Sequence, residues 1–215
     1  MSLVVVATLR LLAAPAFKRR GMLVMCRGNS DCDGLQKGGP ALTERHLVEH
    51  TLGPLYDSNS RVLILGTMPS PLSRANEMYY GNPRNRFWRV LAALFGDPVP
   101  ATNDERQALA LRHGIALWDV LASCTIEGAS DSSIRDGVPN DVPWLLSQAP
   151  ITSLFTTGST AWRLYRRLLE PKTDIAATRL PSPSPANASW SLPRLIEAWQ
   201  PLRTACEQRP SDNSE

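Results

Sequence analysis

The chain has 215 residues, of which 43% are hydrophobic and 20% are charged, a composition that suits one globular domain with a buried core. Its formal net charge is +3, but residues 1–37 hold six basic and two acidic residues, and the remainder holds 17 basic and 18 acidic ones. Overall basicity is therefore no argument for a nucleic-acid partner. The four cysteines lack the paired spacing of a zinc site or a disulfide framework, which favours a reduced, cytoplasmic compartment.

Residues 1–40 have the sequence of an extension, and we expect them to be poorly ordered. Val4–Phe17 is apolar but too short to span a bilayer, and the basic residues follow this run rather than precede it as in a secretory signal. Two alternatives stay open for this segment: a transit peptide, or a true start of translation at Met22 or Met25.

The folded domain is expected to span residues 41–206, with a disordered tail at residues 207–215. Within the domain, short apolar runs rich in β-branched residues predict strands at 61–65, 115–118, 151–157 and 178–180. Helical spacing and capping residues, among them Ser159 and Ser191, predict helices at 85–95, 105–113, 142–148, 159–169 and 191–205. Strands that alternate with helices predict an α/β fold in which helices cover both faces of a parallel sheet.

The segments that follow the predicted strands are candidates for a ligand site, because such sheets bind ligands beyond the carboxyl ends of their strands. All are rich in Ser, Thr, Asn and Pro, and we expect them to converge at one edge of the sheet: 67–88, 119–141, 156–160 and 181–189. The first segment carries the clearest signal. Tyr79–Tyr80, the amide of Asn85 and Phe87–Trp88 favour a pocket for a flat, polar ring such as a nucleobase.

Other motifs give weaker signals. His46-Leu-Val-Glu-His50 matches a zinc pattern with both histidines on one helix face, but no third ligand is evident. With His113 as the one remaining histidine, a Ser-His-Asp hydrolase is difficult to assemble. The glycine-rich phosphate loops are absent, so we expect no nucleotide cofactor. Two arginine clusters suit either a nucleic-acid partner or a solvated helix face: Arg84, Arg86 and Arg89, and Arg163, Arg166 and Arg167.

The blocks that carry chemistry occur in a fixed order along the chain: Gly66–Ser70, Tyr79–Trp88, Asp119–Cys124, Asp131–Asp141, Phe155–Ala161 and Leu180–Asn187. This ordered set resembles the uracil-DNA glycosylase superfamily, and more closely its hypoxanthine-DNA glycosylase (DNA-deoxyinosine glycosylase) branch. The resemblance spans roughly residues 55–200. It implies a three-layer αβα fold with a central four-stranded parallel sheet. It also implies a pocket for a flipped base, and a monofunctional glycosylase without a metal, a cofactor or lyase chemistry.

The resemblance implies that Asn85 is the catalytic residue. Most of the superfamily has Asp or Asn two residues from the Gly that ends the first strand, whereas this chain has Gly66-Thr-Met-Pro69. In the hypoxanthine branch the role passes to the Asn of the Asn-Arg-Phe-Trp run, which is Asn85. An amide is no general base near neutral pH, but its carbonyl can accept a hydrogen bond from a water and hold it under the sugar. Alternatively, Asn85 caps the helix that follows it.

The rest of the expected site surrounds Asn85. Backbone N–H groups of residues 67–70 are expected to stabilise the leaving base, and Tyr80 is expected to stack on it. The expected base pocket comprises Gly66, Thr67, Met68, Pro69, Ser70, Tyr80, Phe87 and Asn140, although Asn140 equally suits a helix cap. The expected DNA-binding residues are Ser159, Pro181, Ser182, Pro183, Ser184 and Asn187. Leu180 and Asn82 stand where relatives often have His.

The sequence therefore predicts a monofunctional glycosylase that excises deaminated bases, hypoxanthine first, from double-stranded or single-stranded DNA. We expect it to act as a monomer, without a membrane partner. One alternative is an enzyme whose main substrate is uracil or another deaminated base such as xanthine. Another is a relative that binds DNA without catalysis.

Deletion of residues 1–40 tests the predicted extension. Because no strand or helix of the pattern falls within them, the truncated chain should keep the melting temperature and activity of the full chain. Thermal unfolding measures the first quantity, and base excision from a labelled duplex measures the second. A large loss of folded protein would show that these residues are a structural part of the domain.

Overall fold

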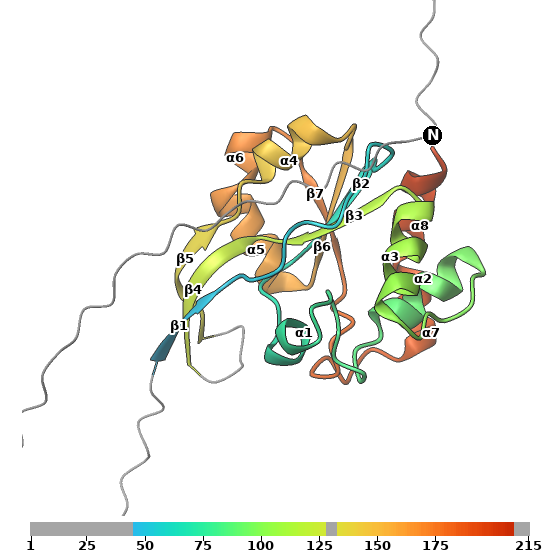
Figure 1. Ribbon diagram of the computed structural model, residues 1–215, viewed down its shortest axis with the longest axis horizontal. Helices are drawn as coiled ribbons and strands as arrows, with labels where there is room; N and C mark the ends of the chain where they lie inside the picture. The colour runs from blue at the N-terminus through green and yellow to red at the C-terminus, as the bar shows by residue number, and fades with distance from the viewer. Residues whose placement is uncertain (1–44, 128–132, 209–215) are drawn as a thin grey trace, which may run out of the picture. The chain divides into compact units, whose positions relative to one another are not determined.

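The computed structural model describes residues 45–127 and 133–208 (Figure 1). Its centre is a four-stranded parallel sheet with the strand order β3-β2-β6-β7. The strands are β2 (Val62–Gly66), β3 (Ile115–Asp119), β6 (Ser153–Thr157) and β7 (Ala177–Leu180). This sheet confirms the predicted parallel strands. The predicted extension at residues 1–40 and nearly all of the predicted tail lie outside the described residues.

Helices cover both faces of the parallel sheet (Figure 1). One face carries α2 (Phe87–Phe95), α3 (Asn103–Arg112), α7 (Leu192–Ala198) and α8 (Gln200–Glu207). The other face carries α4 (Val142–Gln148), α5 (Ser159–Leu168) and α6 (Glu170–Thr173). A short helix, α1 (Pro71–Ala75), follows β2. The predicted three-layer αβα fold is therefore confirmed. Among the described helices, none has the length and apolar character needed to cross a bilayer.

A second sheet was not predicted from the sequence. It is antiparallel, with the order β1-β4-β5, and its strands are β1 (Arg45–Glu49), β4 (Leu121–Glu127) and β5 (Arg135–Pro139). Strands β4 and β5 lie within segment 119–141, which the sequence indicated as a candidate for the ligand site. The helix expected at His46–His50 is wrong: residues 46–49 belong to β1, and His50 comes directly after this strand. In a strand, residues four apart are about 13 Å apart, too far for the two histidines to share one metal ion.

Apart from shifts of one or two residues at helix ends, two helix predictions are wrong. Helix α5 is not capped by Ser159: Gly158 holds the cap position with a φ of 91° and no side-chain bond. The single helix predicted for residues 191–205 is two helices that meet at Trp199, because Pro201 has no N–H to continue the ladder of the first. The predicted cap at Ser191 is confirmed, since its hydroxyl accepts a hydrogen bond from the Arg194 N–H.

Candidate active site

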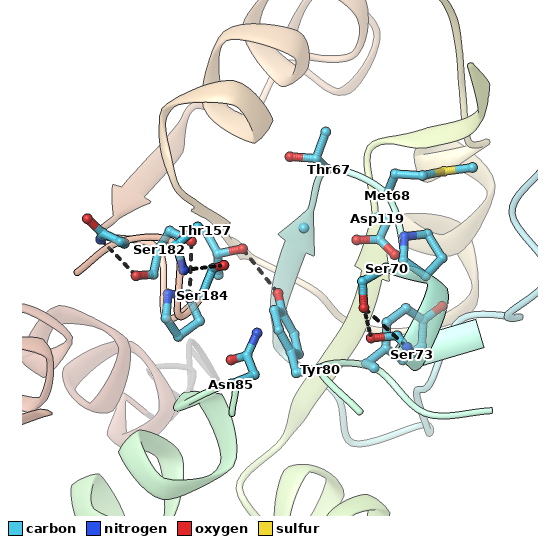
Figure 2. A pocket seen from close by; sticks show the side chains of 16 residues that line it. Thr67, Met68, Ser70, Ser73, Tyr80, Asn85, Asp119, Thr157, Ser182 and Ser184 are labelled. Carbon is cyan, nitrogen blue, oxygen red and sulfur yellow. Dashed lines mark hydrogen bonds between the residues drawn. The ribbon is translucent and has the colours of Figure 1, made fainter. Parts of the chain in front are cut away.

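A cavity of about 460 Å³ lies at the carboxyl ends of the parallel strands (Figure 2). The last residues of three strands contribute to it, namely Gly66 of β2, Asp119 of β3 and Thr157 of β6. The loops that follow β2 and β7 supply most of the other lining residues. The complete lining is Gly66, Thr67, Met68, Pro69, Ser70, Ser73, Tyr79, Tyr80, Asn85, Asp119, Thr157, Ser182, Pro183, Ser184, Ala186 and Asn187.

Most of the residues that the sequence singled out lie around this cavity. The structure brings together Gly66, Thr67, Met68, Pro69, Ser70, Tyr80, Asn85, Ser182, Pro183, Ser184 and Asn187. Four expected residues are not part of the lining: Phe87, Asn140, Ser159 and Pro181. Sequence reasoning missed Asp119 and Thr157 as pocket residues, although their positions at predicted strand ends were a usable signal.

The four residues outside the lining have structural contacts. The Asn140 amide donates to the carbonyl oxygens of Asp119 and Leu121, at 2.9 and 3.0 Å, and so holds the connection between β3 and β4. The carbonyl of Pro181 accepts a hydrogen bond from the Trp199 indole at 3.1 Å. Ser159 is the first residue of α5, and Phe87 is fully buried behind Tyr80. Asn140, Pro181 and Phe87 therefore support the segments around the cavity, whereas Ser159 is exposed.

Tyr80 is held rigidly at the edge of the cavity. Its ring stacks on Phe87 with 3.7 Å between ring centroids and an angle of 4° between the ring planes. Its hydroxyl lies 3.2 Å from the hydroxyl of Thr157, and burial raises the pKa of the phenol, so the group stays neutral. Its φ of 53° is an unusual value for an aromatic residue. Strain of this kind persists where the surroundings fix it, as the stacking does here.

Asn85 is half-buried, and its side chain is directed toward the cavity beside Tyr80 (Figure 2). Its carbonyl oxygen accepts a hydrogen bond of 3.0 Å from the Phe87 N–H. Arg86 holds the helix cap position without a side-chain bond of its own, and the Asn85 carbonyl accepts from the first turn as a capping side chain does, a role compatible with holding a water. The hydrogen bond still fixes the amide to the first turn of α2. The second lone pair of the carbonyl and the NH₂ group can therefore bond a water or a ligand in the cavity.

Asp119 forms a buried pair with His50 at the base of the cavity. Its carboxylate lies 2.8 Å from the His50 Nε2, and both side chains are almost fully buried. Burial raises the pKa of Asp119, and the hydrogen bond from His50 opposes that rise. His50 follows β1, and its N–H donates to the Ala122 carbonyl of β4, so the second sheet holds the imidazole in place.

Gly66 makes room for this carboxylate. Gly66 and Asp119 are directly paired across β2 and β3. A side chain on Gly66 would clash with the Asp119 carboxylate and would lie 3.4 Å from the Tyr80 hydroxyl. A larger residue at the end of β2 would therefore displace the groups that line the cavity. Within residues 45–127 and 133–208, no cluster of three or more histidine, cysteine or acidic residues is placed to hold a metal ion.

Comparison with known proteins assigns this arrangement to a family. The family model of the uracil DNA glycosylase superfamily matches residues 54–203. The chain belongs to this superfamily. The match confirms the predicted family and the prediction that the chain is a DNA glycosylase.

The relatives of this glycosylase include two archaeal proteins. A hypoxanthine DNA glycosylase of Methanosarcina acetivorans is 33% identical over 155 residues, which cover 72% of this chain and 97% of the relative. A hypoxanthine DNA glycosylase of Methanosarcina barkeri is 38% identical over 98 residues, 45% of this chain and 62% of the relative. A solution NMR structure from M. acetivorans, described as a uracil DNA glycosylase, aligns with a TM-score of 0.65 at 30% identity, covering 76% of this chain and 100% of its own.

His50→Ala tests how far the fold depends on the buried pair. The substitution should lower the free energy of unfolding by about 3–5 kcal/mol, because it leaves a buried carboxylate without its partner. His113→Ala is the matched control: His113 lies 2.6 Å from Asp97, but that pair is partly exposed, and its loss should cost clearly less. Urea unfolding of both variants and the parent measures the difference. Equal losses would contradict a special role for the His50–Asp119 pair.

Proposed function

We propose that this DNA glycosylase excises deaminated bases, hypoxanthine first, from double-stranded or single-stranded DNA, acting as a monomer without lyase chemistry. One observation carries the proposal: the Asn85 amide and the Tyr80 ring, which both contact Phe87, face one cavity at the strand ends. The cavity volume of about 460 Å³ falls within the range of roughly 300–1,000 Å³ typical of small-molecule pockets. The two Methanosarcina relatives named for hypoxanthine support the substrate.

The bond to be broken joins the sugar C1′ to a ring nitrogen of the base. As it breaks, positive charge develops on the sugar and negative charge on the departing base. Asn85 holds a water through its carbonyl, and the water oxygen bonds to C1′ once the base leaves. The water releases one proton to solvent as this bond forms, and the departing base anion takes up one proton, so that both products are neutral. Hydrogen-bond donors of the loop at residues 67–70 stabilise the charge on the base, and Tyr80 contacts its ring. The base must leave the duplex stack first, which costs less at a mispaired, deaminated base.

Asp119 suits the selection of hypoxanthine over adenine and of uracil over cytosine. Hypoxanthine and uracil each carry a ring N–H beside a carbonyl, where adenine and cytosine have a ring nitrogen with a lone pair. An ionised carboxylate accepts a hydrogen bond from that N–H and repels a lone pair. The hydrogen bond from His50 favours the ionised form of Asp119 against the effect of burial. The pair therefore supports discrimination of hypoxanthine from adenine and of uracil from cytosine.

The substrate is tested with labelled duplexes and single strands that contain one inosine, uracil or deoxyxanthosine, with undamaged adenine as the control. After incubation with enzyme, alkali cleaves each abasic product, and a gel measures the fraction cut. We expect inosine to be cut fastest and adenine not at all. Preferential cleavage at uracil would show instead that uracil is the main substrate. Binding of all these DNAs without any cleavage would instead identify a non-catalytic relative.

Asn85→Ala tests the catalytic assignment. The variant should lose about 10²–10³-fold or more in single-turnover excision of hypoxanthine, in line with the loss of one positioned polar group, while it still binds inosine DNA. Asn59→Ala is the control, since Asn59 is exposed in the loop that precedes β2, away from the strand ends that form the cavity. If Asn85→Ala excises normally while Asp119→Ala or Asp141→Ala is inactive, a carboxylate mechanism replaces the one proposed.

A further inference from the structure

The Arg86 side chain, next to Asn85 in the chain, forms several hydrogen bonds to one loop. Its guanidinium donates to the backbone carbonyl oxygens of four residues in the connection between β7 and α7, which we call the 183–190 loop. These carbonyls belong to Pro183 at 3.2 Å, Ser184 at 2.7 Å, Asn187 at 3.0 Å, and Trp190. The Arg86 backbone N–H also donates to the Pro183 carbonyl at 3.1 Å.

These bonds tie the loop to the segment that carries Asn85, which the loop's own hydrogen bonds cannot do. The loop lies between the end of β7 and the start of α7, and three of the residues at 181–185 are prolines, which have no N–H to donate. Its internal ties centre on Asn187, whose amide donates to the Ser182 carbonyl at 2.9 Å and whose N–H donates to the Ser184 carbonyl at 3.0 Å. A planar guanidinium can donate in several directions at once, which a lysine ammonium on a flexible stem cannot reproduce.

Arg86 thereby joins two neighbouring segments that line the cavity. One segment contains Asn85, the residue before Arg86 in the chain. The other contains Ser182, Ser184 and Asn187, in the connection that Arg86 holds. The distance between the two segments thus depends on Arg86, through its guanidinium and its backbone N–H. Displacement of a positioned group by about 1 Å can cost on the order of 10²-fold in rate, so this distance matters for excision.

We propose that Arg86 is a positioning residue that clamps the 183–190 loop against the catalytic segment, rather than a contact to DNA phosphate. For its effect on catalysis the inference rests on the proposed function, because Asn85 must act in excision. Its neighbours Arg84 and Arg89 are exposed, whereas Arg86 is half-buried with its donors directed at carbonyl oxygens. The arginine cluster of the sequence is thereby divided: Arg84 and Arg89 are accessible to a phosphate, and Arg86 is bound within the protein.

Hydrogen–deuterium exchange of the free protein tests the clamp without any need for activity. In Arg86→Ala and Arg86→Lys, the amides of residues 182–191 should exchange about tenfold faster or more than in the parent, because the loop opens more often. Arg89→Ala removes the same charge from the same helix and should leave exchange in this loop unchanged. Unchanged exchange in both Arg86 variants would overturn the clamp. If circular dichroism shows that Arg86→Ala does not fold, amide exchange in Arg86→Lys alone decides whether Arg86 clamps the loop.

Excision and DNA binding separate the clamp from a phosphate contact. Both Arg86 variants should lose about 10–100-fold in single-turnover excision of hypoxanthine, while the salt dependence of DNA binding keeps the parent's slope. A phosphate contact predicts the opposite. Arg86→Lys would then excise at nearly the parent's rate, and in Arg86→Ala the slope of the logarithm of DNA affinity against the logarithm of salt concentration would be smaller in magnitude by about 0.9. If the parent excises no base, the proposed function fails, and the exchange measurement still decides whether Arg86 clamps the loop.

Discussion

The cavity depends on the absence of a side chain at Gly66. The direct pairing of Gly66 with Asp119 places a carboxylate against the end of β2, and the Tyr80 hydroxyl lies near the same point. A methyl group at this position would occupy the space of that carboxylate. The end of β2 is thus where backbone, carboxylate and phenol meet, and the approach of all three requires glycine. The remaining lining residues are arranged around this point by the loops that follow β2 and β7.

The antiparallel sheet holds a partner for the carboxylate at the end of β2. Strand β1 is mostly exposed and adds little to the core, but its pairing with β4 sets His50 beside Asp119. A buried carboxylate without a partner would take up a proton, and it would then no longer be a pure hydrogen-bond acceptor. The imidazole opposes that change. The antiparallel sheet therefore has two roles: β4 places Leu121 and Cys124 in the core, and the mostly exposed β1 positions the His50 imidazole beside the Asp119 carboxylate.

The sequence allowed the parallel sheet and its helices to be predicted because their signals are local: apolar runs, caps and glycine stops. The antiparallel sheet escaped because β1 shows no apolar alternation and its pairing with β4 joins residues far apart in the chain. Asn85 and Tyr80 could be singled out from one short segment. Asp119 could be predicted to lie at a strand end, within a segment expected to contribute to the site, but its place in the pocket itself depends on the register between β2 and β3. Asn140 was misplaced for the same reason, because its amide bonds to backbone that only the fold brings near.

The two sides of the cavity are held by different kinds of interaction. The ends of β2, β3 and β6 are fixed by the ladder of the sheet and by the fully buried residues beneath it. The opposite side has no ladder, and the 183–190 loop is held mainly by side-chain bonds from Arg86 and Asn187. Regions held by few bonds open most readily, and flipping a base into the cavity requires DNA to pass this loop. In the proposed function, the fixed strand ends recognise the base, and the 183–190 loop meets the DNA backbone. The backbone strain at Tyr80 belongs to the segment between α1 and α2, where stacking on Phe87 holds the ring in place.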